Sequence, residues 1–234
     1  MNHLIAIVGP TGVGKTSLAV SLARDLYGEV IGADSRQVYR SMDIGTGKPT
    51  LEQRAAATHH LVDVVAPDEP FTLAQYAALA RATLEDVWKR GKLPFLVGGT
   101  GLYVWALLEG WQVPQVPPNH RLRQELEDRA AHGETGKLFA ELAQLDPGSA
   151  CIVDSRNPRR VIRALEICLA LGQPLDRSRR RETPPFSFTI LGLTTSRQDL
   201  YQRIDARVDD MIKEGWLEEV RGLLDRGYAA DLPA

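Results

Sequence analysis

The stretch Gly9-Pro10-Thr11-Gly12-Val13-Gly14-Lys15-Thr16 matches the phosphate-binding pattern G-x-x-x-x-G-K-[ST] and decides the fold class. An apolar run at residues 4–8 precedes it, and apolar residues at helical spacing follow it over residues 15–26. A glycine-rich turn between a strand and a helix directs backbone N–H groups inward, beside the positive end of the helix dipole. The sequence therefore predicts a loop that binds a diphosphate, in which Lys15 supplies a positive charge and Thr16 can hold Mg²⁺.

Strand-like and helix-like segments alternate after this loop. Short runs at residues 29–33, 60–65 and 95–97 are typical of strands, and residues 72–90 are typical of an amphipathic helix that Thr72 caps. Strands that alternate with helices form parallel sheets. We therefore predict an α/β protein with a P-loop-type parallel sheet flanked by helices.

The alternation stops at a cluster of prolines near residues 114–118. Residues 119–172 then show helical patterns only, and a strand-like run returns at residues 186–193. Two further helices are predicted near residues 197–214 and 216–226. We expect three segments: a first part of the P-loop core at 1–113, a helical insertion domain at 114–185, and the final strand and helices of the core at 186–234.

The composition favours a cytoplasmic protein with one sizeable core and a smaller appended unit. The chain has 234 residues, of which 44% are hydrophobic, and the apolar run near its start is short and lacks a basic flank. Neither a signal peptide nor a membrane span is expected. We expect Cys151 and Cys168 to be buried thiols, since no histidines stand near them at the spacing of a zinc site.

The net charge of −2 conceals a strongly basic segment. Between Arg156 and Arg181 the chain has eight arginines and two acidic residues, which gives this segment a charge of +6. Such a field suits an anionic partner, and the insertion is therefore a candidate for contact with nucleic acid. Arg159, Arg160 and Arg163 stand at helical spacing and could contact phosphates, although they could also form a solvated helix face.

Asp34 follows the second predicted strand, at the edge of the sheet where open α/β proteins bind their ligands. A carboxylate at this place can accept a proton from a hydroxyl or an amine. If the loop held ATP, the arrangement would serve a small-molecule kinase, whereas another diphosphate compound would indicate a different transferase. An aspartate here can also simply cap a turn.

Several sequence blocks around these residues resemble the tRNA dimethylallyltransferase family, also called the tRNA isopentenyltransferases. The resemblance spans essentially the whole chain and keeps the family's order. Its blocks lie at residues 9–11, 34–39, 42–49, 97–103, 157–166 and 203–207.

The resemblance implies the transfer of a dimethylallyl group from dimethylallyl diphosphate to the N6 amine of the adenosine adjacent to the tRNA anticodon, with release of diphosphate. Asp34 would act as the general base, Thr100 would lie beside it at the catalytic centre, and Mg²⁺ on Thr16 would be the cofactor. The diphosphate would be bound by Gly9, Pro10, Thr11, Gly12, Val13, Gly14, Lys15, Thr16 and Arg207, with Arg203 as a further candidate.

The partners implied by the resemblance are dimethylallyl diphosphate and the anticodon stem-loop of a tRNA, bound by a monomeric enzyme that has no contact with a membrane. Contacts with the tRNA would come from two regions of the chain. They would be made by Asp34, Ser35, Arg36, Gln37, Thr100, Arg123, Arg159, Arg160, Val161, Ile162 and Arg163.

The family's sequences usually continue beyond the equivalent of residue 234 with further basic helices, so the chain resembles a member that lacks the C-terminal part. Two other interpretations stay open at this point. A P-loop small-molecule kinase would release ADP, and an inactive tRNA-binding fragment would bind its ligands without turnover.

Overall fold

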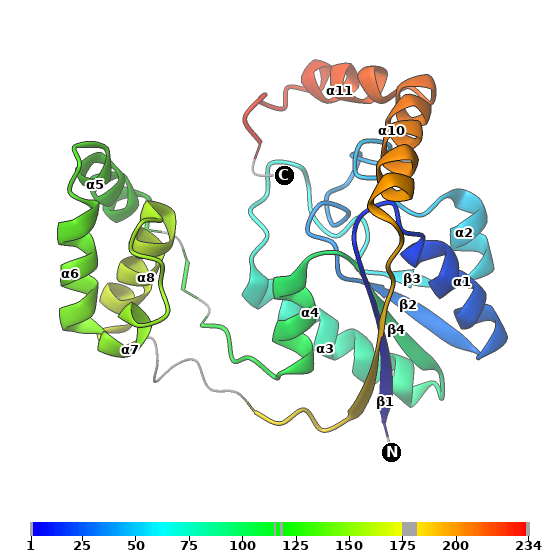
Figure 1. Cartoon of the computed structure of the whole chain (residues 1–234), viewed down its shortest axis with the longest axis horizontal. Coiled ribbons are helices and arrows are strands. Elements are labelled where there is room, and N and C mark those ends of the chain that lie inside the picture. The colour runs from blue at the N-terminus through cyan, green and yellow to red at the C-terminus, as the bar shows by residue number, and fades with distance from the viewer. Residues whose placement is uncertain (1, 115, 118, 175–181, 233–234) are drawn as a thin grey trace. The chain divides into compact units, whose positions relative to one another are not determined.

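The computed structural model describes residues 2–114, 116–117, 119–174 and 182–232 (Figure 1). The chain divides into two compact units. The core unit consists of Met1–Gly110 and Thr183–Ala234, and the helical unit consists of Trp111–Glu182. The insertion predicted at 114–185 covers most of the helical unit, and each unit has its own hydrophobic core.

The core unit is built on a five-stranded parallel sheet with the strand order β3-β2-β4-β1-β5. Ile5 of the first strand faces Phe95 on one side and Thr189 on the other, which fixes the register of the three neighbouring strands. The predicted P-loop-type α/β fold is confirmed. The strands are β1 His3–Val8, β2 Gly28–Gly32, β3 His59–His60, β4 Leu93–Val97 and β5 Ser187–Gly192.

Alternate side chains of the central strands pack into two separate clusters, one on each face of the sheet. Leu4 and Ala6 of β1 pack with Tyr76 in one cluster, whereas Ile7 packs with Ala19 in the other. Successive residues of a strand point to opposite faces, so a continuous apolar run such as β1 requires helices on both sides. Figure 1 shows α1 on one face of the sheet and α3 with α4 on the other.

Three helices of the core unit, α2, α3 and α10, begin at a side chain that accepts a hydrogen bond from the first turn. Thr72 accepts a hydrogen bond from the N–H of Gln75, whose side chain accepts one from the N–H of Thr72, so the predicted cap is a capping box. Ser196 caps a later helix through the N–H of Asp199. The helices are α1 Lys15–Asp25, α2 Leu51–Ala56, α3 Leu73–Lys89, α4 Gly101–Leu108, α10 Arg197–Lys213 and α11 Trp216–Asp225.

The strand predicted at residues 60–65 is wrong in most of its length. Pairing with β2 ends at His60, and Leu61 and Asp63 both have a φ of 60°, in the left-handed region that a strand cannot include. The side chain of Asp63 accepts hydrogen bonds from Lys48 and Arg54, so polar contacts with distant residues outweigh the local preference for a strand.

The helical unit contains α5 His120–Ala131, α6 Thr135–Leu145, α7 Pro147–Ala150 and α8 Pro158–Leu171. Leu126, Leu138, Leu142 and Leu165 are buried where three of these helices meet. Cys168 lies in the same core, as predicted, but Cys151 is exposed because it follows the short helix α7 at the surface.

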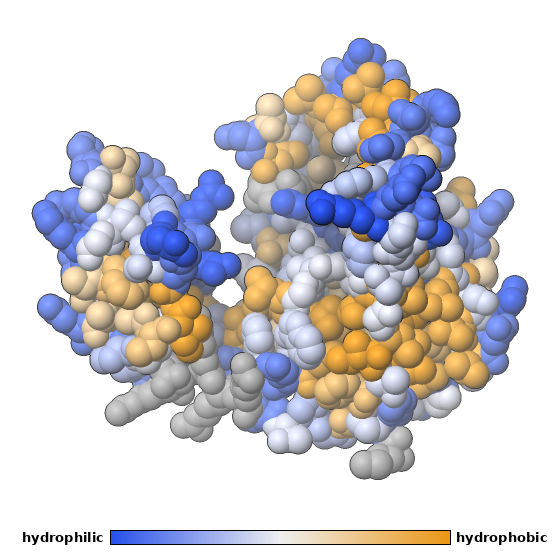
Figure 2. Space-filling view, in the orientation of Figure 1, coloured by the Kyte–Doolittle hydropathy of each residue, from blue (hydrophilic) through white to orange (hydrophobic). Residues whose placement is uncertain are grey.

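Some hydrophobic side chains of the core unit remain on its surface. Phe188 and Ile190 of the edge strand β5 are 40% and 39% exposed, and an apolar area lies over this strand in Figure 2. Leu217 and Leu224 of α11 are similarly exposed. Among the described residues, no helix is both long enough and apolar enough to cross a membrane.

Candidate functional site

A cavity of about 1540 Å³ lies in the core unit where the carboxyl ends of β1, β2 and β4 meet. This is the edge at which parallel sheets bind their ligands. The phosphate loop lines the cavity after β1, Asp34 after β2 and Gly98 after β4, while Arg203 and Arg207 reach it from α10. Segments far apart in the sequence therefore surround one site, as the predicted α/β fold requires.

The phosphate loop turns sharply from β1 into α1. Gly14 has a φ of 98° and is the N-cap of α1, so a residue with a side chain would be strained at the point where the helix begins. Lys15 donates hydrogen bonds to the carbonyls of Gly9 and Pro10, both at 2.9 Å. The loop thus presents the N-terminus of α1 and an ammonium group at the same cavity.

The charges around Lys15 link the loop to the other predicted site residues. Burial lowers the pKa of the Lys15 ammonium; the negative charge of Asp34 opposes this shift, and the positive charge of Arg207 adds to it. Asp34 and Arg207 line the same cavity as Lys15, so their charges act on its ammonium group. The site therefore brings together two cations that suit an anionic ligand and one carboxylate that can accept a proton.

Asp34 and the residues after it are held by short polar contacts. Its Oδ1 accepts a hydrogen bond from the N–H of Arg36 at 2.9 Å, which turns the chain away from β2. Thr100 Oγ1 accepts a hydrogen bond from the N–H of Ser35 at 2.9 Å, and the N–H of Thr100 donates to the carbonyl of Ala33 at 3.1 Å. The predicted pair of Asp34 and Thr100 is thus joined through neighbouring backbone groups.

A buried tyrosine stands beside this segment. Burial, together with Tyr39 and Asp34, raises the pKa of the Tyr103 phenol to about 12, although Arg36 partly offsets the shift. The ring of Tyr103 stacks on that of Tyr76 with 3.8 Å between the ring centroids. The family block at residues 97–103 includes this tyrosine, for which no role was predicted, and in the structure its ring lies in the hydrophobic core close to Asp34.

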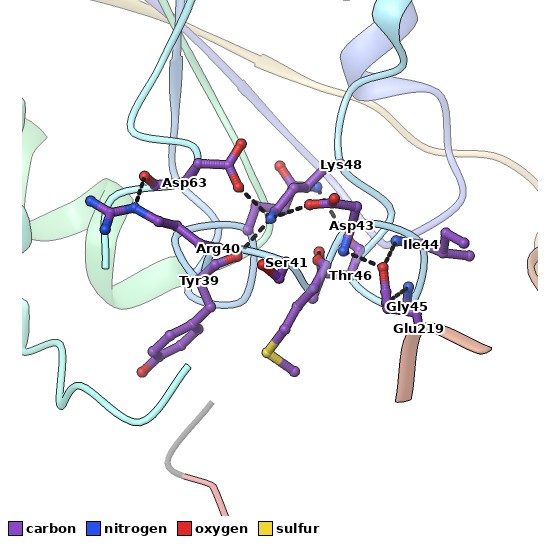
Figure 3. A network of polar contacts seen from close by, with 12 residues as sticks. Tyr39, Arg40, Ser41, Asp43, Ile44, Gly45, Thr46, Lys48, Asp63 and Glu219 are labelled. Carbon is purple, nitrogen blue, oxygen red and sulfur yellow. Dashed lines mark hydrogen bonds and ion pairs between the residues drawn. The ribbon is translucent and has the colours of Figure 1, made fainter. Parts of the chain in front are cut away.

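A loop at residues 41–48 closes another side of the cavity, and no individual role was predicted for its residues. The buried Lys48 binds this loop to its surroundings (Figure 3). Its Nζ is 2.6 Å from Asp43 Oδ1, 2.5 Å from Asp63 Oδ1 and 2.6 Å from the carbonyl oxygen of Tyr39. The carbonyl of Gly47 accepts hydrogen bonds from Gln37 at 2.9 Å and from Arg207 at 3.3 Å. The predicted residues Gln37 and Arg207 therefore meet on this loop.

The predicted tRNA contacts of the helical unit fall into three groups. Arg159 and Arg160 are exposed on α8. Val161 and Ile162 are 0% and 4% exposed, so their side chains belong to the core of the unit and are not offered to a ligand. Arg123 and Arg163 form the third group. The basic residues Arg177, Arg179, Arg180 and Arg181 lie outside the described residues.

Arg123 and Arg163 bind the same buried carboxylate. Each places a guanidinium nitrogen 2.7 Å from Glu166 Oε2, and the N–H of Asn119 donates to Oε1 at 2.8 Å. Burial would raise the pKa of Glu166, but the hydrogen bonds from Arg123, Arg163 and Asn119 outweigh it and lower the pKa. The two arginines remain about one third exposed, so Glu166 orients them at the surface of the unit.

The described residues contain no group of three or more His, Cys, Asp or Glu side chains that could hold a metal ion. Thr16 lines the cavity at the start of α1 and offers a hydroxyl oxygen. Mg²⁺ prefers oxygen ligands and is usually held by few protein groups together with water and the phosphates of a substrate. The residues present fit that mode of binding and no all-protein cage.

Comparison with known proteins identifies the chain's relatives. The family model described as IPP transferase matches residues 37–234, and the model described as isopentenyl transferase matches residues 2–62. The tRNA dimethylallyltransferase of Roseiflexus sp. (strain RS-1) is 52% identical over 100% of this chain and 77% of its own length. That of Chloroflexus aurantiacus (strain ATCC 29366 / DSM 635 / J-10-fl) is 53% identical over 100% of this chain and 79% of its own length.

Solved structures agree with the sequence comparison. The tRNA isopentenylpyrophosphate transferase of Bacillus halodurans matches with a TM-score of 0.67 and 43% identity, over 98% of this chain and 72% of that one. A eukaryotic dimethylallyltransferase acting on tRNA matches with a TM-score of 0.81 and 31% identity, over 97% of this chain and 56% of that one. These relatives do not favour the kinase or the inactive fragment. The chain belongs to the tRNA dimethylallyltransferase family of prenyltransferases.

Proposed function

We propose that this protein transfers a dimethylallyl group from dimethylallyl diphosphate to the N6 amine of the adenosine adjacent to the anticodon of a tRNA. The observation that carries the proposal is the meeting of the phosphate loop, Asp34 and Arg207 around one cavity in a chain of this family. A diphosphate leaving group requires the cations, and an amine nucleophile gains from the carboxylate.

The phosphate loop and α10 supply the groups that would hold the diphosphate. The N–H groups at the start of α1, the ammonium of Lys15 and the guanidinium of Arg207 all line the cavity, where they would attract an anionic ligand. As the carbon–oxygen bond of the substrate breaks, negative charge grows on the departing diphosphate. Cations fixed in place before the reaction stabilise that charge without further reorganisation.

Asp34 is the proposed general base. The adenine N6 forms a bond to the allylic carbon, the carbon–oxygen bond to diphosphate breaks, and the proton of N6 passes to the carboxylate of Asp34. The N–H of Arg36 holds one carboxylate oxygen, and Thr100 holds the backbone of Ser35 beside it. These contacts keep the base in a fixed orientation toward the cavity.

Mg²⁺ is the proposed cofactor. Thr16 would contribute a hydroxyl ligand, and the oxygens of the substrate diphosphate would complete the site with water. The chemistry that the ion supplies is neutralisation of charge on the leaving group. The phosphate loop and Arg207 would bind the diphosphate itself.

A tRNA is the proposed second substrate. The exposed side chains of Arg159 and Arg160, together with the oriented pair Arg123 and Arg163, would contact its phosphates. Asp34, Ser35, Arg36, Gln37 and Thr100 would surround the target nucleotide. A base stacked in an RNA loop must leave the stack to react in a pocket, so its extrusion is part of the proposed reaction.

The experiment incubates the chain with Mg²⁺, dimethylallyl diphosphate and an unmodified tRNA whose anticodon is followed by adenosine. The mass of the intact RNA is the readout, and Asp34→Ala is the control. We expect a mass gain of one dimethylallyl group that is absent with the variant. Formation of ADP from ATP with no change in the RNA would overturn the proposal in favour of a kinase.

A further inference from the structure

The carboxylate of Glu219, on α11, binds three consecutive backbone N–H groups of the loop at residues 41–48. Its Oε2 accepts from the N–H of Asp43 at 2.6 Å and of Ile44 at 2.7 Å, and its Oε1 accepts from the N–H of Gly45 at 3.0 Å. Figure 3 shows the carboxylate facing this turn of the backbone. Successive N–H groups that converge in this way form a binding site for an anion, and here the anion is a side chain of the same protein.

Two other contacts attach the same end of the chain to this loop. The backbone of Gly45 lies against the indole of Trp216, so close that a β-carbon at Gly45 would be 2.2 Å from the indole nitrogen. Arg226 donates a hydrogen bond to Ser41 Oγ at 3.1 Å. The loop is therefore held along its length by α11 and the residue that follows it.

The other side of the loop carries groups of the proposed diphosphate site. Gly47, two residues beyond the turn held by Glu219, accepts hydrogen bonds through its carbonyl from both Gln37 and Arg207. Arg207 also lies close enough to Lys15 to lower its pKa. A shift of the loop would thus move the acceptor that orients Arg207.

The charge of Glu219 makes a direct role in binding diphosphate unfavourable. Glu219 lines the same cavity as the phosphate loop, where an unpaired carboxylate would repel an anionic ligand. The three N–H donors bind this carboxylate instead, so that its negative charge holds the loop in place. The carboxylate of Glu219 therefore lies in this cavity because it binds the backbone of the loop at residues 41–48.

We infer that Glu219 is a positioning residue for the diphosphate substrate, acting through the loop at residues 41–48 on Arg207. The inference rests on the proposed function for the identity of the substrate, but the geometry that it invokes concerns any diphosphate in the cavity. Its test therefore uses inorganic pyrophosphate, whose binding is measured separately from the transfer of the prenyl group.

The test compares Glu219→Gln with Glu218→Gln, a matched control on the same helix whose carboxylate pairs only weakly with Arg221 at 3.4 Å. Both carboxylate oxygens of Glu219 accept hydrogen bonds from backbone N–H groups, and glutamine replaces one of these oxygens with an NH₂ group, which can only donate. We expect the Kd of Mg²⁺-pyrophosphate, measured by calorimetry, to rise about tenfold, the effect of losing one hydrogen bond to a charged group. The KM for dimethylallyl diphosphate should rise by a similar factor, with a smaller change in kcat.

Hydrogen exchange of the backbone reports on the loop itself. We expect the N–H groups of Asp43, Ile44 and Gly45 to exchange faster in Glu219→Gln than in the wild type. In the control, their exchange rates should equal those of the wild type. If the exchange accelerates but pyrophosphate binds as tightly as in the wild type, Glu219 only stabilises the loop and the inference is overturned. If Glu219→Gln does not fold, Glu219→Asp, which keeps the charge, serves in its place with an expected intermediate loss of affinity.

The outcome separates the inference from the proposed function. A wild-type protein that binds pyrophosphate but transfers no prenyl group to tRNA would contradict the function and leave the role of Glu219 to be decided by the binding series. A wild-type protein that transfers the group, with unchanged pyrophosphate affinity in Glu219→Gln, would contradict the inference alone.

Discussion

Replacing Glu166 with glutamine should destabilise the helical unit strongly, although the substitution only exchanges a carboxylate oxygen for an amide nitrogen. The carboxylate is 0% exposed, and it accepts hydrogen bonds from Arg123, Arg163 and the N–H of Asn119. Removal of one partner from a buried ion pair costs about 3–5 kcal/mol, because the remaining charge is left without compensation. The two arginine side chains are each about one third exposed and can turn toward water, so we expect a loss near 3 kcal/mol.

The dependence on pH follows from the same contacts. The pKa of Glu166 is lower in the folded protein than in the unfolded chain, so the carboxylate stabilises the fold at neutral pH. This contribution is complete above the unfolded pKa of about 4.3 and is lost progressively as the pH falls from there through the lower pKa of the folded state. Glutamine does not titrate, so the stabilities of wild type and variant should converge in acid.

Urea unfolding, followed by circular dichroism, measures the effect. The control is Glu141→Gln, which removes an exposed partner of Arg129 from the same unit and should change stability little. With a slope of about 1–3 kcal/mol per molar urea, the midpoint for Glu166→Gln should fall by roughly 1–3 M. Equal midpoints for the two variants, or a difference between wild type and Glu166→Gln that does not shrink as the pH is lowered below the unfolded pKa of the carboxyl group, would refute the reasoning.

Three further predictions concern the proposed reaction. Lys15→Met should weaken the binding of Mg²⁺-pyrophosphate about 10–100-fold in calorimetry, and unchanged affinity would place the diphosphate elsewhere. Asp34→Asn should lower kcat about 10²–10⁴-fold with little change in pyrophosphate affinity, and a full rate in a single-turnover assay would exclude it as the base. Arg159→Ala and Arg160→Ala should each reduce the dependence of log K for tRNA on log salt by about 0.7–0.9, and unchanged slopes would show that neither arginine contacts a phosphate.

The phosphate loop and the sheet could be predicted because their signals are local. A single stretch of eight residues, residues 9–16, specifies both the turn and the start of α1. The buried strands are short apolar runs next to it, and alternation with helices leaves few arrangements other than a parallel sheet. Asp34 was placed correctly at the cavity for the same reason, since it directly follows β2.

The contacts that the sequence did not reveal join residues far apart in the chain. Glu219 reaches the N–H groups of Asp43 to Gly45 only because α11 packs there, and nothing near residue 219 distinguishes it from the neighbouring Glu218. The prediction of a strand at residues 60–65 was wrong for the same reason, since Lys48 and Arg54, which are distant in the sequence, bind the side chain of Asp63.

The apolar face of α8 was the one missed signal that the sequence did contain. Val161 and Ile162 stand three to four residues before Leu165, a spacing that places all three on one side of a helix. That pattern predicts a buried face, and the structure shows all three in the core of the helical unit. Val161 and Ile162 were included among the expected tRNA contacts because they lie in a block that resembles the family. Their helical spacing indicates instead that their side chains pack in a core.

In the proposed reaction, Asp34, Lys15 and Arg207 surround a prenyl diphosphate whose prenyl group passes to tRNA. The most direct test follows one reaction mixture of the chain, Mg²⁺, tRNA and dimethylallyl diphosphate without ATP. It counts both the diphosphate released and the modified adenosine recovered after digestion of the RNA to nucleosides. We expect equal amounts of the two products, with the prenyl group on N6 of the adenosine beside the anticodon. Diphosphate release without modified adenosine, or modification that depends on ATP, would contradict it.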